Sequence, residues 1–226
     1  MKLSIVVPVY NESRTILTAI SRIQKTPFEK EIIVVDDASS DGTYEQLQNF
    51  SQSSEIILLH HQRNMGKGAA LRTGLAKATG DIIITQDADL EYWPEDYPTL
   101  IDLIQRDAAD VVYGSRFIGR HRVFSFTHWL GNFFLNLMAN ILFNTTLTDL
   151  ETGLKAFRRE VLSGYILKSN DFRIEVELTA KVCKRGYRLY EVPILYTGRT
   201  YAEGKKLTWR DGFPALWALI RFRFGD

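Results

Sequence analysis

The chain has 226 residues, of which 45% are hydrophobic and 24% charged, and its formal net charge is +1. This composition is typical of a globular protein that buries one substantial core, with one domain as the default. The near-neutral charge gives no global indication of a nucleic-acid or strongly acidic partner. The single cysteine, Cys183, excludes an internal disulfide framework and a multi-cysteine metal site, and fits a reducing cytoplasm.

Two segments could be mistaken for a signal peptide or a membrane span, and neither is predicted to be one. Residues 1–8 carry one positive charge and an apolar run that is too short for a signal peptide, and we expect a first core strand there. Residues 123–148 lack Asp, Glu, Lys and Arg and are long enough to cross a bilayer. Four asparagines recur at every fourth position there: Asn132, Asn136, Asn140 and Asn144. A polar stripe at this spacing predicts an amphipathic helix instead.

Short β-branched apolar runs alternate with helical patterns over the first half of the chain. The expected strands cover residues 3–9, 31–35, 56–59, 81–85 and 110–113. The expected helices cover residues 12–24, 43–50, 68–78 and 94–105. Repeated strand–helix units predict an α/β fold of the Rossmann-like kind, a mostly parallel sheet with helices on both faces. Its ligands should lie outside the carboxyl ends of the strands.

After Arg116 the regular alternation stops. We expect an aromatic helix at residues 124–143, a strand near residues 153–157, a helix around residues 175–184 and a strand at residues 188–195. No repeat or low-complexity linker divides the chain, so residues 1–226 are predicted to form one domain. Its two lobes are residues 1–116 and 117–226.

Two carboxylates directly follow the fourth expected strand. Asp87 and Asp89 are separated only by Ala88, and Glu91 follows two residues later as a third oxygen donor. Hard oxygen ligands at this spacing suit Mg²⁺ or Mn²⁺, which completes its shell with water and substrate phosphates. A solvated turn is the alternative for so short a motif, so its context decides.

Polar motifs also follow the first two expected strands, at residues 8–12 (PVYNE) and 36–43 (DDASSDGT). Both strand ends face the same expected crevice. A carboxylate there can accept hydrogen bonds from a base or a ribose, and Tyr10 can pack against a base. A helix cap at Asn11 and a turn at residues 41–42 are the alternatives.

At these points the sequence closely resembles the family 2 inverting glycosyltransferases of the GT-A fold, in particular the dolichyl- or polyprenyl-phosphate mannosyl- and glucosyltransferases. The matching segments are residues 7–12, 35–43, 64–68 (NMGKG), 87–91, 114–116 and 198–201, and together they span nearly the whole chain. The resemblance implies a metal-dependent hexosyltransferase. Residues 1–116 would be its nucleotide-sugar and metal-binding lobe, and residues 117–226 its acceptor lobe.

The resemblance also assigns the donor residues. The nucleoside pocket is expected at Pro8, Tyr10, Glu12, Val35 and Asp37. The diphosphate and the metal are expected at Asp87, Ala88 and Asp89, with Glu91 as an additional metal ligand. Residues 64–68 lack the full spacing of a phosphate-binding P-loop, and we expect them to shape the donor site.

Three cations complete the expected catalytic set around Asp89. Arg199 and Lys205 lie around Gly204, so a lid loop would bring them onto the departing diphosphate, the role that the family implies. Lys206 is able to exchange roles with Lys205, and solvated loop charges are the alternative. Arg116 ends the fifth strand and matches an arginine that lies between the donor and acceptor phosphates.

The acceptor residues depart from the family pattern. Relatives carry an arginine and a serine near the acceptor phosphate where this chain has His128 and Asn132, and Arg120 and Arg122 are competing phosphate ligands. A phosphate monoester is largely anionic at neutral pH, so it attacks the anomeric carbon without a strong base. A base, for which Glu175 and Glu177 are candidates, is needed only for a hydroxyl acceptor.

The resulting hypothesis is inverting transfer of a hexose from GDP-mannose or UDP-glucose to a polyprenyl or dolichyl phosphate. Transfer to a saccharide or other hydroxyl, a pyrophosphate-releasing nucleotidyltransferase and a non-catalytic nucleotide-sugar-binding subunit are the alternatives. Residues 207–224 mix aromatic and basic side chains. We expect this segment and residues 124–143 to rest on the cytoplasmic face of a membrane, directly or through a membrane subunit, with packing into the core as the alternative.

Overall fold

The computed structural model describes residues 1–50, 56–123, 125–199 and 212–225. The first half alternates strands and helices as predicted: β1 (Leu3–Val9), α1 (Ile16–Gln24), β2 (Lys30–Asp36), α2 (Thr43–Phe50), β3 (Ile56–His60), α3 (Lys67–Leu75), β4 (Ile82–Thr85), η1 (Pro94–Asp96), α4 (Tyr97–Gln105) and β5 (Val111–Ser115). The second half contains α5 (Phe126–Phe143), β6 (Lys155–Arg158), α6 (Arg159–Leu162), α7 (Arg173–Lys184), β7 (Leu189–Pro193) and α8 (Gly212–Phe224).

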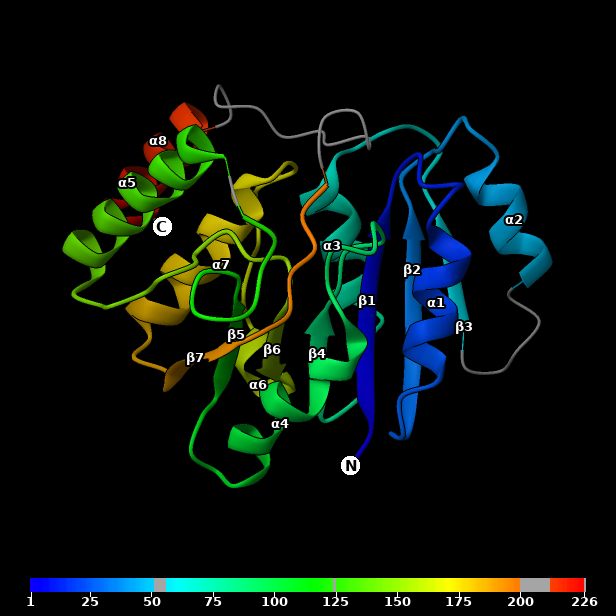
Figure 1. Ribbon diagram of the computed structural model, residues 1–226, viewed down its shortest axis with the longest axis horizontal. Coiled ribbons are helices and arrows are strands. Elements are labelled where there is room, and N and C mark those ends of the chain that lie inside the picture. The colour runs from blue at the N-terminus through cyan, green and yellow to red at the C-terminus, as the bar shows by residue number, and fades with distance from the viewer. Residues whose placement is uncertain (51–55, 124, 200–211, 226) are drawn as a thin grey trace.

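The strands form one seven-stranded sheet in the order β3-β2-β1-β4-β6-β5-β7. β6 pairs antiparallel with both β4 and β5, whereas the other neighbours pair in parallel. In Figure 1 the arrowhead of β6 accordingly points away from the edge toward which β2 and β4 point. The predicted mostly parallel α/β sheet is confirmed. Because β6 comes from the second half of the chain and lies between β4 and β5 of the first half, the two halves share one sheet.

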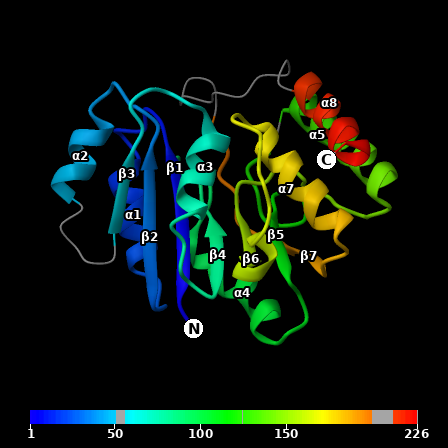
Figure 2. The same ribbon diagram turned by 180° about the vertical axis from the view of Figure 1, so that it is seen from behind.

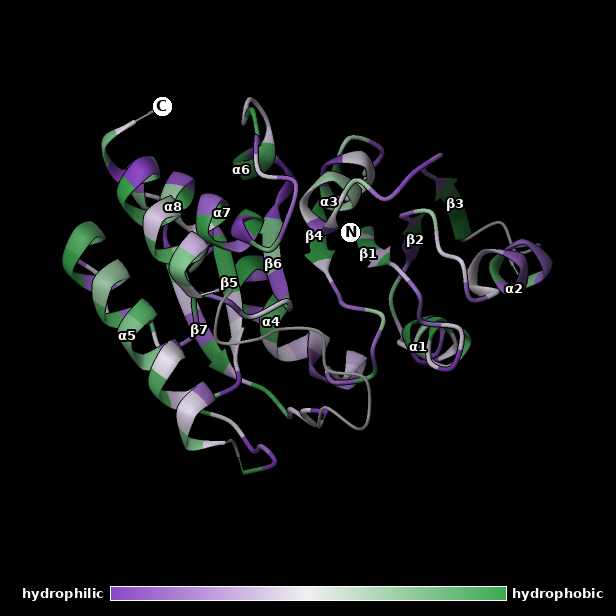
Figure 3. Ribbon diagram, turned by 90° about the horizontal axis from the view of Figure 1, so that it is seen from above, coloured by the Kyte–Doolittle hydropathy of each residue, from purple (hydrophilic) through white to green (hydrophobic). Residues whose placement is uncertain are grey.

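Helices cover both faces of this sheet, and Figures 2 and 3 show α3 and α7 on the opposite side from α1. Alternate residues of β1 enter different cores because strand side chains alternate between faces. Ile5 and Val7 pack with α1 and α4, while Val6 packs with α3 and α7. Burial on both faces explains why β1 and β2 are continuous apolar runs.

The helix predicted from residue 12 begins later, at Ile16. Asn11 adopts a left-handed conformation with φ of 53°, and the backbone N–H of Glu12 donates to Thr43 Oγ1 over 3.0 Å. The first residues after β1 are therefore held in a turn that contacts the loop after β2. This turn places polar groups at the carboxyl edge of the sheet.

The asparagine stripe of α5 faces inward. Asn136 donates to Thr148 O and accepts from Leu150 N, and Asn140 binds both backbone groups of Leu147. These bonds hold the loop that follows the helix. The exposed side of α5 is consequently aromatic and aliphatic, which reverses the usual orientation of an amphipathic surface helix. No helix in the described part of the chain combines the length and apolarity needed to cross a membrane.

A carboxylate network ties the amino-terminal ends of β1 and β2 together. Glu31 accepts hydrogen bonds from Lys2 Nζ at 2.6 Å, Ser4 Oγ at 2.5 Å and the Thr79 backbone at 2.7 Å. Burial alone would raise the pKa of Glu31, but these bonds outweigh it and lower the pKa to about 2. The ionised carboxylate is therefore the form that stabilises the fold.

We predict that Glu31→Gln lowers the free energy of unfolding by on the order of 2 kcal/mol at pH 7. Because the folded pKa lies below the ordinary value of 4.5, this contribution is present above pH 4.5 and disappears as the pH falls toward 2. Urea denaturation at pH 7 and pH 3 measures both effects. Glu29→Gln, at an exposed position, is the control. Equal losses at both pH values would contradict the prediction.

Candidate active site

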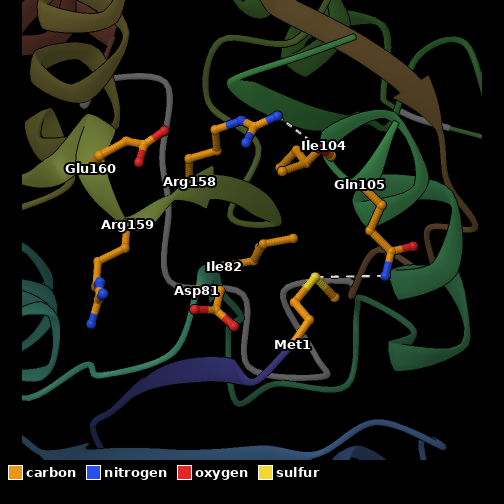
Figure 4. A pocket seen from close by; sticks show the side chains of 8 residues that line it. All are labelled: Met1, Asp81, Ile82, Ile104, Gln105, Arg158, Arg159 and Glu160. Atoms are coloured by element: carbon orange, nitrogen blue, oxygen red, sulfur yellow. Dashed lines mark hydrogen bonds between the residues drawn. The ribbon is translucent and has the colours of Figure 1, made fainter. Parts of the chain in front are cut away.

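The candidate site is a cavity of about 500 Å³ outside the carboxyl ends of β1, β4 and β5. A second cavity, of about 460 Å³, lies at the opposite edge of the sheet. Figure 4 shows Arg158 of this second cavity pointing to Ile104, whose carbonyl accepts its hydrogen bond, and Arg159 donates to the carbonyl of Thr79. Those cations stabilise loops, whereas the first cavity collects most of the predicted motif residues.

The loops after β1 and β2 are fastened to each other. The backbone N–H of Asn11 donates to Ser39 Oγ, and Asn11 Oδ1 accepts from the N–H of Ser40. This two-way contact uses the left-handed conformation of Asn11. Asn11 thus fixes the wall of the cavity that carries Tyr10 and Glu12, both of which line it. Tyr10 keeps 38% of its surface exposed, so its ring is accessible for packing against a ligand.

Asp37 holds the loop that precedes α3. Its carboxylate accepts from the backbone N–H groups of Met65 and Gly66 at 2.8 and 2.7 Å, and from His61 Nδ1 at 2.7 Å. Gly66 has φ of 92°, and a Cβ there would lie 2.3 Å from the carbonyl oxygen of Asn170. Residues 64–68 therefore shape the cavity wall through close backbone contact, which requires glycine.

Asp87 lies between a cation and a glycine. Lys67 Nζ is 2.7 Å from Asp87 Oδ1 and 3.0 Å from Oδ2. On the other side, a Cβ on Gly153 would lie only 2.1 Å from Asp87 Oδ2. Gly153 is itself held because its N–H donates to the hydroxyl of Tyr92 and its carbonyl accepts from Thr85. The Asp87 carboxylate has little freedom to move between these neighbours.

Arg199 is surrounded by three carboxylates. Its guanidinium lies 2.9 Å from Asp89, 3.1 Å from Glu12 and 3.4 Å from Glu91, and its backbone N–H also donates to Glu91 at 2.8 Å. The second oxygen of Glu91 accepts from the hydroxyl of Tyr196. The fold thus places the Arg199 guanidinium, which comes from a distant part of the chain, beside the carboxylates that follow β4.

Negative charge exceeds positive charge at this end of the cavity. Burial, with the charges of Glu91 and Asp87, raises the pKa of Asp89 to about 7, and Arg199 offsets this only in part. Such a site favours an additional cation. No group of three or more His, Cys, Asp or Glu side chains in the described ranges is arranged as a metal cage. Mg²⁺ and Mn²⁺ are commonly held by one or two carboxylates and substrate phosphates, so Asp87 and Asp89 fit this class.

The opposite wall carries a buried arginine. Arg116 forms a bidentate ion pair with Asp149, with N–O distances of 2.8 and 2.7 Å, and its Nη2 lies 3.4 Å from Asn132 Oδ1. The guanidinium also lies 5.4 Å from the centre of the Tyr196 ring. His128 and Asn132 both line the cavity, one turn apart on α5. Polar donors from β5 and α5 therefore meet at one place.

Residues 4–166 match the family model described as Glycosyl transferase family 2. The chain belongs to this family. An undecaprenyl-phosphate mannosyltransferase of Micrococcus luteus is 27% identical over 249 aligned residues, which cover 100% of both chains. A dolichol-phosphate mannosyltransferase of Pyrococcus furiosus is 30% identical over 217 residues, covering 91% of this chain and 59% of its own length.

Solved structures extend the likeness to the whole fold. Glucosyl-3-phosphoglycerate synthase from Mycobacterium tuberculosis, in complex with Mn²⁺, uridine diphosphate and phosphoglyceric acid, has a TM-score of 0.77. It is 20% identical and covers 100% of this chain and 79% of its own. At this identity the comparison shows the fold alone, and it confirms the predicted GT-A architecture. The protein is therefore a family 2 glycosyltransferase with that architecture.

Most residues predicted for the glycosyltransferase site lie together along the cavity, and three of the described ones do not line it. The side chain of Val35 is fully buried beneath α3. Arg120 and Arg122 lie on the segment whose backbone pairs with Tyr196, outside the cavity lining. Lys205 falls outside the described residues. The roles assigned to all the site residues, those along the cavity included, remain predictions.

Glu175 and Glu177, the two candidate bases for a hydroxyl acceptor, have different surroundings. Glu175 lines the cavity, where Lys67 and Lys155 contact its two oxygens. Glu177 is fully buried and accepts from the backbone N–H groups of Lys168 and Ser169. Glu177 thus holds the backbone at residues 168–169 and does not itself line the cavity. Neither carboxylate is arranged as a free base in the described structure.

Asp149 and Gly153 are site residues that the sequence did not predict. Both precede β6, whose antiparallel direction places its first residues at the edge where the parallel strands end. A parallel strand would have placed them at the opposite edge. The polar, glycine-containing run before β6 was the only local signal, and such runs also mark ordinary turns.

We predict that Gly153→Ala reduces glycosyl transfer by about tenfold or more while the protein stays folded. The new Cβ meets the Asp87 carboxylate and displaces it, and small displacements of reacting groups cost large factors in rate. Initial rates with a saturating donor, together with thermal melting, test this. A folded Gly153→Ala protein with full activity would show that the position of Asp87 is unimportant.

Proposed function

We propose that this glycosyltransferase transfers a hexose, with inversion, from a nucleotide sugar to a polyprenyl or dolichyl phosphate. The observation that carries the proposal is one cavity with an acidic end at Asp87 and Asp89 and a cationic wall at Arg116. The names of the two mannosyltransferase relatives support a lipid-phosphate acceptor and favour mannose as the sugar. GDP-mannose and UDP-glucose are the donors to compare.

At the donor end, Asp87 and Asp89 would hold Mg²⁺ or Mn²⁺ against the diphosphate. Glu91 would be a ligand only after it gives up one of the hydrogen bonds that both its oxygens accept. When bound, the cation supplies charge neutralisation for the leaving group. Arg199 binds Asp89 in the described structure and lies close enough to contribute positive charge to the same diphosphate. Tyr10 packs against the base, and Glu12 accepts from the ribose.

At the acceptor end, Arg116 binds the lipid phosphate, and His128 and Asn132 contribute hydrogen bonds. Asp149 holds the guanidinium in one orientation through Nε and Nη2, and Arg116 lines the cavity. The acceptor phosphate attacks the anomeric carbon on the face opposite the leaving nucleoside diphosphate, which inverts the configuration. Because this phosphate is already anionic, no proton has to be removed from it. The lysine contacts of Glu175 agree with a reaction that needs no carboxylate base.

The lipid acceptor requires access to a membrane, and α5 and α8 supply a suitable surface. The two helices pack side by side, and Figure 3 shows α5 largely in hydrophobic colours. Their exposed large apolar residues, which we call the aromatic face, are Phe126, Trp129, Phe133, Phe134, Leu137 and Ile141 of α5, and Phe213, Trp217, Ile220 and Phe224 of α8. Arg221 and Arg223 lie on α8, where they can meet anionic headgroups. We propose peripheral binding at the cytoplasmic membrane face.

We predict that transfer requires a divalent cation and a polyprenyl phosphate, and that Asp89→Ala abolishes it. Radiolabelled GDP-mannose and UDP-glucose, each tested with undecaprenyl and dolichyl phosphate, measure product formation. EDTA should stop the reaction, and Mg²⁺ or Mn²⁺ should restore it. Circular dichroism establishes that the Asp89→Ala protein is folded. Near-normal turnover by this folded variant would exclude the proposed metal role.

The acceptor panel also separates the alternatives. Sugar transfer to a free saccharide without any lipid phosphate would favour a hydroxyl acceptor and a glutamate base. Donor binding without turnover on any acceptor would favour a non-catalytic subunit. Release of pyrophosphate from a nucleoside triphosphate would favour a nucleotidyltransferase.

We predict that Phe134→Ser with Trp217→Ser weakens binding to vesicles by at least about tenfold. Burial of one such side chain contributes about 1.5–3 kcal/mol, and about 1.4 kcal/mol corresponds to a factor of ten. Sedimentation with phosphatidylglycerol-containing vesicles measures the binding. Tyr190→Ser, which removes an exposed aromatic residue of β7 away from the aromatic face, is the control. Unchanged sedimentation of the double variant would contradict membrane docking. A wild-type protein that is a dimer in solution and becomes a monomer in the double variant would also contradict it, because the aromatic face would then be a dimer interface.

A further inference from the structure

A chain of alternating charges runs from the cavity into the core. Asp87 contacts Lys67 at 2.7 Å, Lys67 lies 3.2 Å from Glu175 Oε1, and Glu175 Oε2 contacts Lys155 Nζ. Lys155 is fully buried. Its Nζ also donates to the carbonyl of Leu150 at 3.0 Å. Two carboxylates thus alternate with two ammonium groups over the distance between the donor end and the sheet.

The inner end of this chain is rigid. Lys155 lies on β6 and is held by Glu175, by Leu150 O and by the face of the Tyr113 ring, 4.7 Å away. An ammonium group in the core is stable only with such partners, because an unpaired buried charge is very costly. Lys155 therefore fixes one oxygen of Glu175. The other oxygen, Oε1, is buried and accepts no hydrogen bond from the described residues.

Glu175 Oε1 acts on Lys67 through charge at 3.2 Å. A lysine side chain is flexible, so its ammonium group stays in one place only when its surroundings hold it. Glu175 attracts Lys67 from one side, Asp87 attracts it from another, and the Phe172 ring lies 5.7 Å from the ammonium nitrogen. The location of Lys67 therefore depends on both carboxylates.

We propose that Lys67 positions the Asp87 carboxylate, and that Glu175, anchored by Lys155, fixes Lys67 in that position. Gly153 limits the carboxylate from the opposite side. The inference rests on the proposed function, because it assumes that Asp87 serves the metal-bound donor diphosphate. Lys67 and Glu175 are positioning residues that act through Asp87. Partners that orient a metal-binding carboxylate commonly affect metal affinity by about 10- to 100-fold.

The variant Lys67→Met distinguishes a positioning effect of Lys67 on Mn²⁺ affinity from the effect of its positive charge. Loss of a positive charge beside Asp87 would, by Coulomb attraction alone, tighten the binding of a divalent cation. Loss of positioning weakens it. We expect Mn²⁺ to bind about tenfold more weakly in the presence of guanosine diphosphate or uridine diphosphate, as measured by the electron paramagnetic resonance signal of free Mn²⁺. Unchanged or tighter binding by a folded Lys67→Met protein would overturn the inference.

A double-mutant cycle tests whether Glu175 acts through Lys67. Glu175→Gln should weaken Mn²⁺ binding by itself, but add little in the Lys67→Met background, because its target is then absent. Full additivity would overturn the role of Glu175. If Glu175→Gln does not fold, Glu175→Asp replaces it, since it keeps the charge for Lys155 but is too short to reach both lysines.

Glu177→Gln is the matched control on the same helix. It removes a similarly buried carboxylate that does not line the cavity and contacts Lys168, Ser169 and Lys181 instead, so it should lower the melting temperature and leave Mn²⁺ affinity unchanged. Equal weakening by Glu177→Gln would assign the effect to general damage and overturn the inference. Failure of the wild-type protein to bind Mn²⁺ with either nucleotide would overturn the proposed function and the inference together. Normal wild-type binding with an unaffected Lys67→Met protein would overturn the inference alone.

Discussion

The balance of buried charge at the carboxyl edge of the sheet determines how this glycosyltransferase is built. Arg199 is placed among Glu12, Asp89 and Glu91, while Lys67 is placed against Asp87. Each carboxylate alone would be costly to bury, and their mutual repulsion adds to that cost. The cations come from segments far apart in the sequence. Loops after β1 and β4, the start of α3 and the segment that follows β7 must therefore meet at one edge.

Close backbone contact follows from the same constraint. Gly66 and Gly68 allow the start of α3 to approach the carbonyls of residues 169–170, and Gly153 allows the segment before β6 to lie against Asp87. A side chain at any of these positions would collide with the Asp87 carboxylate or with the backbone of residues 169–170. The glycines thus set the distances on which the electrostatic balance depends. This is why part of the family motif consists of residues without chemistry of their own.

The elements were predictable from the sequence because their signals are local. Strands such as β1 and β2 are buried on both faces and appear as continuous apolar runs, and the helices have apolar residues at regular spacing. The antiparallel direction of β6 has no local signal, so the contributions of Asp149 and Gly153 could not be predicted. The inward orientation of Asn136 and Asn140 also depends on a loop that returns to its own helix. Motif residues were predictable, but their partners were not.

The two ends of the cavity place opposite demands on the proposed ligands. The proposed donor end has more acidic than basic groups, so a nucleoside diphosphate would need an added cation to bind there. Under the proposed function, Arg116 on the opposite wall would contact the acceptor phosphate without a metal, although Asp149 already neutralises part of its charge. Binding of the donor with its cation reduces the negative potential that an anionic acceptor would meet. Under the proposed function, this charge distribution favours a lipid phosphate that enters after the donor, from the aromatic face, whose Trp129 lines the cavity.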